Sequence, residues 1–261
     1  MDYFEMFDRN IGVITMEEQR LLRKIKVGIV GCGGMGSTSG QILARTGIES
    51  FTVADQDTFQ SVNINNQFTA FKSTLGQNKA VVLAKFIQDI NPAASVKVYS
   101  EGLQDGNVDE FVGNVDIVFD CVDYNELYYS YILNKKTREY NKYMLTPQAV
   151  GYGGSVLVYD PKGISLNEYL GLQEGLTKKQ IDKFTIPPEK YSPIIPSYVD
   201  SETIERTVMK QIPIPNIALA QTLIASIMVS EALFILLKKR EPVTVPSVIA
   251  VDCLEKKFVM R

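Results

Sequence analysis

The sequence contains no histidine, and this absence restricts the chemistry open to the protein more than any other feature. Histidine is the usual general base near neutral pH, the commonest zinc ligand and a member of every Ser-His or Cys-His triad. Enzymes built on such triads are therefore excluded. We expect the chemistry to depend on carboxylates, lysine, arginine and a metal ion carried by phosphate.

Cysteine is scarce. Cys32, Cys121 and Cys253 lie far apart in the sequence and form no CxxC pair. This spacing suggests neither a zinc site nor a disulfide framework. For each of the three we favour a small buried side chain over a nucleophile.

Basic clusters and a secretory signal are also missing. The formal net charge is −3, and the lysines and arginines are scattered, so we do not expect nucleic acid as the main partner. Residues 1–10 carry acidic and aromatic side chains where a signal peptide needs a basic start and an apolar core, which predicts a cytoplasmic protein. The longest apolar stretch, 217–237, includes Gln221 and Glu231, which favours a buried helix over a membrane span.

Strand and helix patterns alternate in the first part of the chain. Residues 26–30, 50–55 and 115–121 are short apolar runs typical of buried parallel strands. Residues 37–46 and 79–90, which lie between them, have helical spacing. We therefore predict an α/β fold with a doubly wound, Rossmann-like, mostly parallel sheet.

The pattern changes after residue 143. Residues 144–150 and 155–159 are joined by too few residues for a helical crossover, which predicts an antiparallel pair. Most of the chain's prolines follow in a crossover segment, 160–215, with a short helix at 177–183. A long helix and a hairpin, 248–260, close the chain. We expect a single domain (1–261) that comprises an N-terminal helical arm (1–25), a nucleotide-binding half (26–143) and an antiparallel extension (144–261).

A glycine-rich turn follows the first predicted strand and opens a helix. Gly31, Gly33, Gly34 and Gly36 leave backbone amides and the helix dipole free to face a phosphate group. Asp55 ends the next strand, where a carboxylate can accept hydrogen bonds from ribose hydroxyls. These residues predict a nucleotide site without distinguishing ATP from NAD.

Two charged residues further along favour ATP. Lys79 opens a predicted helix and can neutralise phosphate oxygens, and Asp123 follows a predicted strand and can hold a magnesium ion that bridges those oxygens. An NAD-dependent oxidoreductase leaves both residues unexplained. We keep it as the weaker alternative.

In this order, the motifs resemble those of the ubiquitin-activating-enzyme superfamily, in particular its ThiF/MoeB/HesA branch, over nearly the whole chain. The resemblance implies that Asp55, with Asp57 close by, is the ribose-binding acid. It places the asparagine and glutamine of the family's N-x-x-R-Q motif at Asn63 and Gln67. It also makes Lys79 the phosphate-binding lysine and Asp123 the magnesium ligand.

The resemblance carries one addition and one departure. A family arginine that reaches the phosphates of the neighbouring subunit falls on Arg9, which implies a homodimer. The arginine of N-x-x-R-Q is Asn66 here, and loss of such a donor commonly costs about 3 kcal/mol in the transition state. Arg9, Lys72 or another cation could replace it; otherwise the enzyme is slow or binds ATP without turnover.

The family's chemistry suits a chain without histidine. An ionised carboxylate is already a nucleophile for the α-phosphate of ATP, so acyl-adenylate formation needs no general base. We therefore expect an ATP- and magnesium-dependent adenylyltransferase acting on a protein C-terminus, a peptide or a small acid. Residues 143–252 contain no cysteine, which argues against the thioester step of conjugating relatives. A catalytically impaired nucleotide-binding scaffold, or a dehydratase acting on a carboxylated tRNA nucleoside, stays open as an alternative.

Overall fold

Eight strands form one sheet. They are β1 (Lys26–Val30), β2 (Ser50–Ala54), β3 (Ser95–Tyr99), β4 (Ile117–Asp120), β5 (Tyr143–Val150), β6 (Gly153–Tyr159), β7 (Ile249–Asp252) and β8 (Lys257–Met260). The spatial order is β3-β2-β1-β4-β5-β6-β7-β8. The strands from β3 to β5 are parallel, and those from β5 to β8 are antiparallel. The structure, a computed structural model, describes residues 2–260, and it confirms the predicted mostly parallel sheet with an antiparallel extension.

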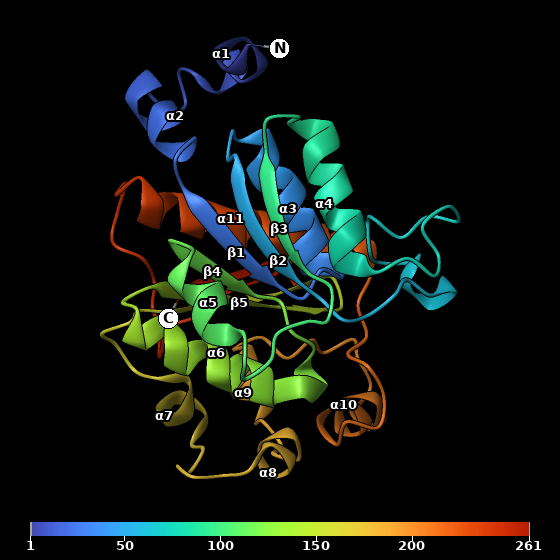
Figure 1. The fold of residues 1–261 in the computed structure, drawn as a ribbon. Coiled ribbons are helices and arrows are strands. Elements are labelled where there is room, and N and C mark those ends of the chain that lie inside the picture. Colours follow the sequence, from blue (N-terminus) through green and yellow to red (C-terminus); the bar gives the residue numbers. More distant parts are fainter. Residues whose placement is uncertain (1, 261) are drawn as a thin grey trace.

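Helices cover both faces of this sheet (Figure 1). The helical segments are α1 (Tyr3–Met6), η1 (Asp8–Asn10), α2 (Met16–Leu22), α3 (Gly34–Arg45), η2 (Ser61–Asn63), α4 (Lys79–Ile90), α5 (Val108–Gly113), η3 (Tyr124–Glu126), α6 (Leu127–Glu139), α7 (Leu166–Leu170), α8 (Lys178–Asp182), α9 (Pro188–Tyr191), α10 (Ser201–Val208) and α11 (Ala218–Leu236). Helices α3, α4 and α11 pack on one face, and α5 and α6, with α7 and α8 outside them, pack on the other.

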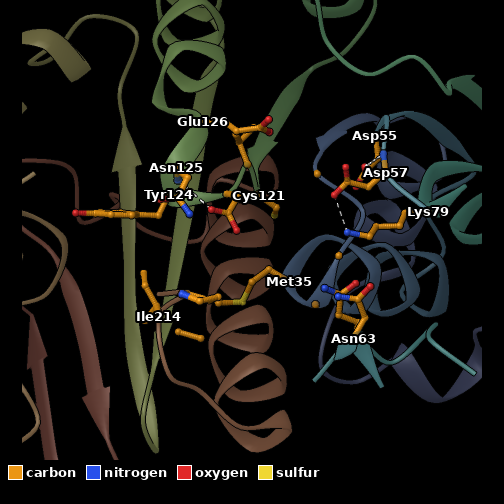
Figure 2. A pocket seen from close by; sticks show the side chains of 18 of the residues that line it. Met35, Asp55, Asp57, Asn63, Lys79, Cys121, Tyr124, Asn125, Glu126 and Ile214 are labelled. Atoms are coloured by element: carbon orange, nitrogen blue, oxygen red, sulfur yellow. Dashed lines mark hydrogen bonds and ion pairs between the residues drawn. The ribbon is translucent and has the colours of Figure 1, made fainter. Parts of the chain in front are cut away.

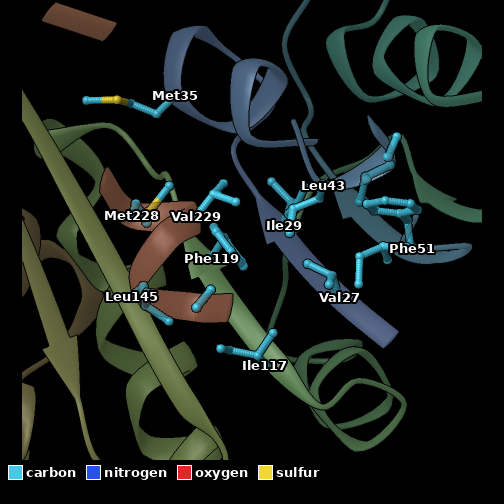
Figure 3. Close-up of a cluster of buried hydrophobic side chains, with 14 of the residues drawn as sticks. Val27, Ile29, Met35, Leu43, Phe51, Ile117, Phe119, Leu145, Met228 and Val229 are labelled. Carbon is cyan, nitrogen blue, oxygen red and sulfur yellow. The ribbon is translucent and has the colours of Figure 1, made fainter. Parts of the chain in front are cut away.

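The central strands are buried on both sides because each face carries its own apolar core. Val27 and Ile29 of β1 point into the core beneath α3 and α11, together with Phe119 of β4 (Figure 3). Val30 of β1 belongs to the opposite core, which includes Phe111 of α5. This two-sided burial explains why the parallel strands appear in the sequence as continuous apolar runs.

Helix α11 is the one described helix that is long and apolar enough to cross a membrane, with a mean hydropathy of 1.9. It packs against α3 on one side and against β5 and β6 on the other. Met228 and Val229 of α11 lie in the same core as β1 and β4 (Figure 3). These contacts are those expected of a core helix.

The N-terminal arm is fixed to the C-terminal end of α3. The Tyr3 hydroxyl donates a hydrogen bond to the Gly47 carbonyl at 2.8 Å, and the buried Gln19 amide donates to Tyr3 and to the Thr46 carbonyl. The arm then leads into the start of β1. It therefore lies at the sheet edge opposite the carboxyl ends of the parallel strands (Figure 1).

One prediction about the cysteines is wrong. Cys32 is buried and Cys121 is half-buried, but Cys253 is exposed. Cys253 begins the turn between β7 and β8, so its side chain points out of the hairpin instead of into a core. A small apolar side chain is not a reliable sign of burial at the tip of a hairpin.

A buried acid in α11 supplies a test of the fold. The side chain of Glu231 is only 4% exposed, and it pairs with Arg240, whose side chain is 39% exposed. Removing the arginine leaves a buried carboxylate without its cation. We expect Arg240→Met to lower the free energy of unfolding by about 2 kcal/mol. The matched variant Lys97→Met, which breaks the exposed pair with Glu110, should cost below about 1 kcal/mol.

Urea unfolding followed by circular dichroism measures both variants. Equal midpoints for the two variants would show that the Arg240 pair contributes no more than a surface pair.

Candidate active site

A cavity of about 610 Å³ opens at the carboxyl ends of the parallel strands. It lies where the strand order reverses between β1 and β4, the position at which open α/β sheets bind ligands. Ten of the twelve predicted site residues line it: Gly31, Gly33, Gly34, Asp55, Asp57, Asn63, Asn66, Gln67, Lys79 and Asp123. Asp55, Asp57 and Lys79 stand on one wall and Tyr124 and Glu126 on the other (Figure 2).

The glycine loop is shaped mainly by the packing of the chain against itself. Gly31 has φ +85°, and a Cβ there would lie 2.2 Å from the Cys121 carbonyl oxygen. A Cβ on Gly36 would lie 1.8 Å from the Gly31 carbonyl oxygen, and one on Gly34 would lie 2.5 Å from the Gln221 side chain. Gly36 lies behind the loop and does not line the cavity. Gly33 caps α3 with no side-chain hydrogen bond, so the first amides of the helix stay available to an anion.

Asp55 is held by the backbone on both of its carboxylate oxygens. Oδ2 accepts a hydrogen bond from the Cys32 amide at 2.6 Å, and Oδ1 accepts one from the Asp57 amide at 2.8 Å. Burial raises the pKa of Asp55, while these two bonds and the charge of Lys79 oppose the rise. Each oxygen keeps a lone pair, so the carboxylate is a fixed acceptor for a ligand hydroxyl.

Lys79 and Asp57 form an ion pair in the cavity wall. Lys79 Nζ lies 2.9 Å from Asp57 Oδ2 (Figure 2). The lysine is the first residue of α4 and is buried, because the helix cap at Asn78 fixes its backbone beside the end of β2. Its stem is thus covered by protein, and the position of its ammonium group is set by Asp57.

Three of the predicted site residues lie in the loop after β2 and have amide side chains. The Asn63 side chain accepts a hydrogen bond from the Gln60 amide and so caps the loop. Gln67 lies beside Gly33, and its Oε1 is buried with no partner among the described residues. Asn66 donates to Asn216 Oδ1 at 2.8 Å.

Asn216 and Gln221 are cavity residues that the sequence did not reveal. Gln221 of α11 donates to the same Asn216 oxygen at 2.9 Å as Asn66 does. A network of three amides therefore stands where the family motif would have a cation. Asn66 and Asn216 are 150 residues apart, and no motif or periodicity connects them.

Asp123 lines the cavity and directly precedes Tyr124, which stands on the wall opposite Lys79 (Figure 2). Its Oδ1 accepts a hydrogen bond from the Asn125 amide at 2.9 Å and caps η3, which leaves Oδ2 free. Partial burial raises the pKa of the neighbouring Glu126, and the charges of Asp57 and Asp123 add to the rise. No group of three or more acidic, cysteine or histidine side chains able to hold a metal occurs in residues 2–260. Asp123 is thus an exposed carboxylate on the cavity with one oxygen available to a ligand.

Arg9 is not brought to this cavity within one chain. It is exposed in η1, in the arm that is fixed to the C-terminal end of α3. The glycine loop is at the other end of α3, and twelve helical residues span about 18 Å. Only a second copy of the chain could present Arg9 to the cavity.

The cysteines near the cavity are poor nucleophiles. Cys32 is fully buried, and Cys121 lines the cavity wall. Burial raises the pKa of both thiols well above the ordinary value, and nearby carboxylates raise it further. Both side chains are therefore protonated at neutral pH.

Curated proteins of known sequence match part of the chain. An adenylyltransferase and sulfurtransferase of Lodderomyces elongisporus is 32% identical over 44% of this chain and 25% of its own length. A probable molybdopterin-synthase adenylyltransferase of Porphyra purpurea is 29% identical over 58% of this chain and 39% of its own length. A tRNA threonylcarbamoyladenosine dehydratase of Haemophilus influenzae is 30% identical over 47% of this chain and 48% of its own length. The chain aligns with a quarter to a half of the length of these relatives.

Solved structures match nearly the whole chain. PaaA superposes with a TM-score of 0.74 over 99% of this chain and 82% of its own, at 16% identity. Escherichia coli MccB with ATP superposes with a TM-score of 0.69 over 94% of this chain and 65% of its own, at 21% identity. At these identities the likeness shows the fold alone. The sequence profile of the ThiF family, however, matches residues 7–261, and the chain belongs to the ThiF family.

Proposed function

We propose that the protein is an ATP- and magnesium-dependent adenylyltransferase that activates a carboxylate as an acyl-adenylate. The observation that carries the proposal is the arrangement of charge in the cavity. A fixed acceptor, Asp55, and a lysine, Lys79, share one wall, and Asp123, a carboxylate with a free oxygen, directly precedes Tyr124, which stands on the other. A ribose, a polyphosphate chain and its metal ion need these three groups in this order.

From these contacts we propose a place for each part of ATP. The ribose hydroxyls donate to Asp55, whose oxygens are already oriented by two backbone amides. The phosphates lie across the glycine loop and the first amides of α3, and Lys79 exchanges Asp57 for a phosphate oxygen. Asp123 would then hold the metal ion that accompanies the leaving pyrophosphate.

The reaction follows from this placement without a general base. An oxygen of the ionised substrate carboxylate attacks the α-phosphorus, the bond from that phosphorus to the bridging oxygen breaks, and pyrophosphate leaves. The products are the mixed anhydride and pyrophosphate, and no proton moves. This balance agrees with a chain that has no histidine and whose cavity cysteines are protonated.

The donors present suit magnesium bound together with the nucleotide. Magnesium usually takes one or two carboxylates and completes its shell with phosphate oxygens and water. Asp123 has one free oxygen, whereas Asp57 is paired with Lys79. The ion would neutralise charge on the departing pyrophosphate.

The balance of charge in the cavity supports a second subunit. Four acids line it, Asp55, Asp57, Asp123 and Glu126, and Lys79 is the one cation among the described lining residues. A bound triphosphate adds more negative charge. Asn66 is neutral and supplies no positive charge to offset it. Arg9 of a neighbouring copy would restore the balance, and we infer a homodimer. Exposed apolar side chains in the loop between β2 and α4, such as Val62 and Phe71, support such an interface.

Relatives suggest the kind of carboxylate without fixing it. Solved structures of MccB include complexes with MccA and with N-formylated MccA. Other relatives are named as both adenylyltransferase and sulfurtransferase, and this chain spans a quarter of the length of one of them. We propose a peptide, a small protein or a small acid as substrate, cytoplasmic action, and an acceptor nucleophile supplied from elsewhere.

The role of Asp123 can be separated from its helix cap. Asp123→Asn keeps an oxygen that accepts from the Asn125 amide but removes the charge. Because magnesium needs the charge, we expect both Asp123→Asn and Asp123→Ala to lower magnesium-dependent pyrophosphate exchange at least a hundredfold, with an unchanged melting temperature for the Asn variant. Full exchange activity in Asp123→Asn would show that Asp123 caps η3 but does not bind magnesium.

Subunit mixing tests Arg9. We expect Arg9→Ala and Lys79→Ala each to lower the rate of pyrophosphate exchange about a hundredfold or more, because each removes a cation from the phosphates. A mixed dimer holds one site with both cations, so mixing should restore part of the wild-type rate. No recovery, with subunit exchange confirmed by mass spectrometry, would show that Arg9 does not act across a dimer.

The cysteines should be dispensable for activation. We expect a variant with Ala at positions 32, 121 and 253 to retain adenylate formation, measured by pyrophosphate exchange, provided that its circular dichroism spectrum is native. Electrophoresis of the wild type with substrate, with and without thiol, is the matching experiment. A reducible adduct that is lost on replacing one cysteine would contradict the proposal.

A further inference from the structure

A second cavity adjoins the nucleotide cavity and is not used by the proposed reaction. Its volume is about 90 Å³. Tyr124, Gln148, Ile214 and Pro215 line both cavities, so the two share a wall. In Figure 2, Tyr124 and Ile214 lie together on the side of the cavity away from Asp55 and Lys79.

The crossover segment builds most of this second cavity. Its lining includes Ile186, Ile194 and Ile204, and no charged side chain occurs among the described lining residues. Tyr191 of α9 packs on Tyr124, with ring centroids 5.4 Å apart, and closes one side. The walls therefore suit an uncharged, apolar group and reject a phosphate or an acidic side chain.

The volume restricts the size of the group. An apolar cavity of about 150 Å³ in another protein is large enough to bind benzene. The present cavity is smaller, so a branched aliphatic chain fits better than an aromatic ring. A glycine has no side chain to place there.

Gln148 stands where the two cavities meet. It extends from β5 and lines both, and its side chain makes no hydrogen bond within residues 2–260. A peptide group that lies between an activated carboxylate and an apolar side chain would meet this amide. The Gln148 side chain can therefore form a hydrogen bond with the backbone of a substrate that extends from one cavity into the other.

We propose that the second cavity is a specificity pocket for a branched aliphatic side chain carried next to the activated carboxylate. The inference rests on the proposed function and names its substrate class: a peptide or amino acid that ends in leucine, isoleucine or valine, instead of a Gly-Gly tail. Burying such a side chain favours it over glycine by about tenfold or more.

Isoleucine methyl resonances test occupancy without requiring turnover. With the isoleucine δ1 methyl groups labelled, 4-methylpentanoate should shift the resonances of Ile186, Ile194 and Ile204 in the presence of magnesium and a non-hydrolysable ATP analogue. Acetate should not shift these resonances. The resonances of Ile29 and Ile117, which are buried in the core, should stay unchanged with either acid. An absence of shifts at the pocket residues would overturn the inference whether or not an activity is found.

Pyrophosphate exchange with peptides that differ only in the last residue tests selection. We expect exchange with a leucine terminus to exceed that with glycine at least tenfold. Ile204→Ala should reduce this ratio several-fold and admit a phenylalanine terminus, while Met209→Ala, an exposed change in the same segment, should leave the ratio unchanged. Equal exchange with leucine and glycine would overturn the inference and leave adenylation standing. Absence of exchange with every carboxylate would contradict the proposed function, and the methyl shifts alone would then decide about the pocket.

Discussion

The hydrogen bonds of Asp55 hold the nucleotide cavity together. Its carboxylate accepts from the backbone of the glycine loop on one oxygen and from Asp57 on the other. The side chain of Asn78 joins the same point, because it donates to the carbonyl oxygens of both Asp55 and Asp57. The loop after β1, the end of β2 and the start of α4 therefore form one unit, and Lys79 takes its position from that unit.

The other side of the cavity depends on amides instead of charges. Asn216 accepts from Asn66 and from Gln221, which fastens the loop after β2 to the end of the crossover segment and to α11. Where the family motif would have a guanidinium group, this protein has a neutral contact. Lys79 is then the one cation that lines the cavity among residues 2–260, and this deficit is the physical reason to look for Arg9 on a second chain.

The parts of this architecture that follow from local sequence were predictable. Strands β1, β2 and β4 are buried on both faces and appear as apolar runs, and the glycine loop and Asp55 follow such runs directly. Strand β3 was missed because it is an edge strand with exposed residues such as Ser95 and Lys97. The Asn216 network and the second cavity were also missed, because they arise from contacts between distant segments. Cys253 was assigned wrongly because burial at a hairpin tip depends on tertiary contacts.

The central claim is that a carboxylate oxygen attacks the α-phosphorus of ATP. A carboxylate substrate labelled with oxygen-18 tests it most directly, with mass spectrometry of the nucleotide released after the adenylate breaks down. We predict AMP that carries one oxygen-18 atom from the carboxylate, together with unlabelled pyrophosphate. Release of ADP with labelled inorganic phosphate would place the attack at the γ-phosphorus and contradict the account.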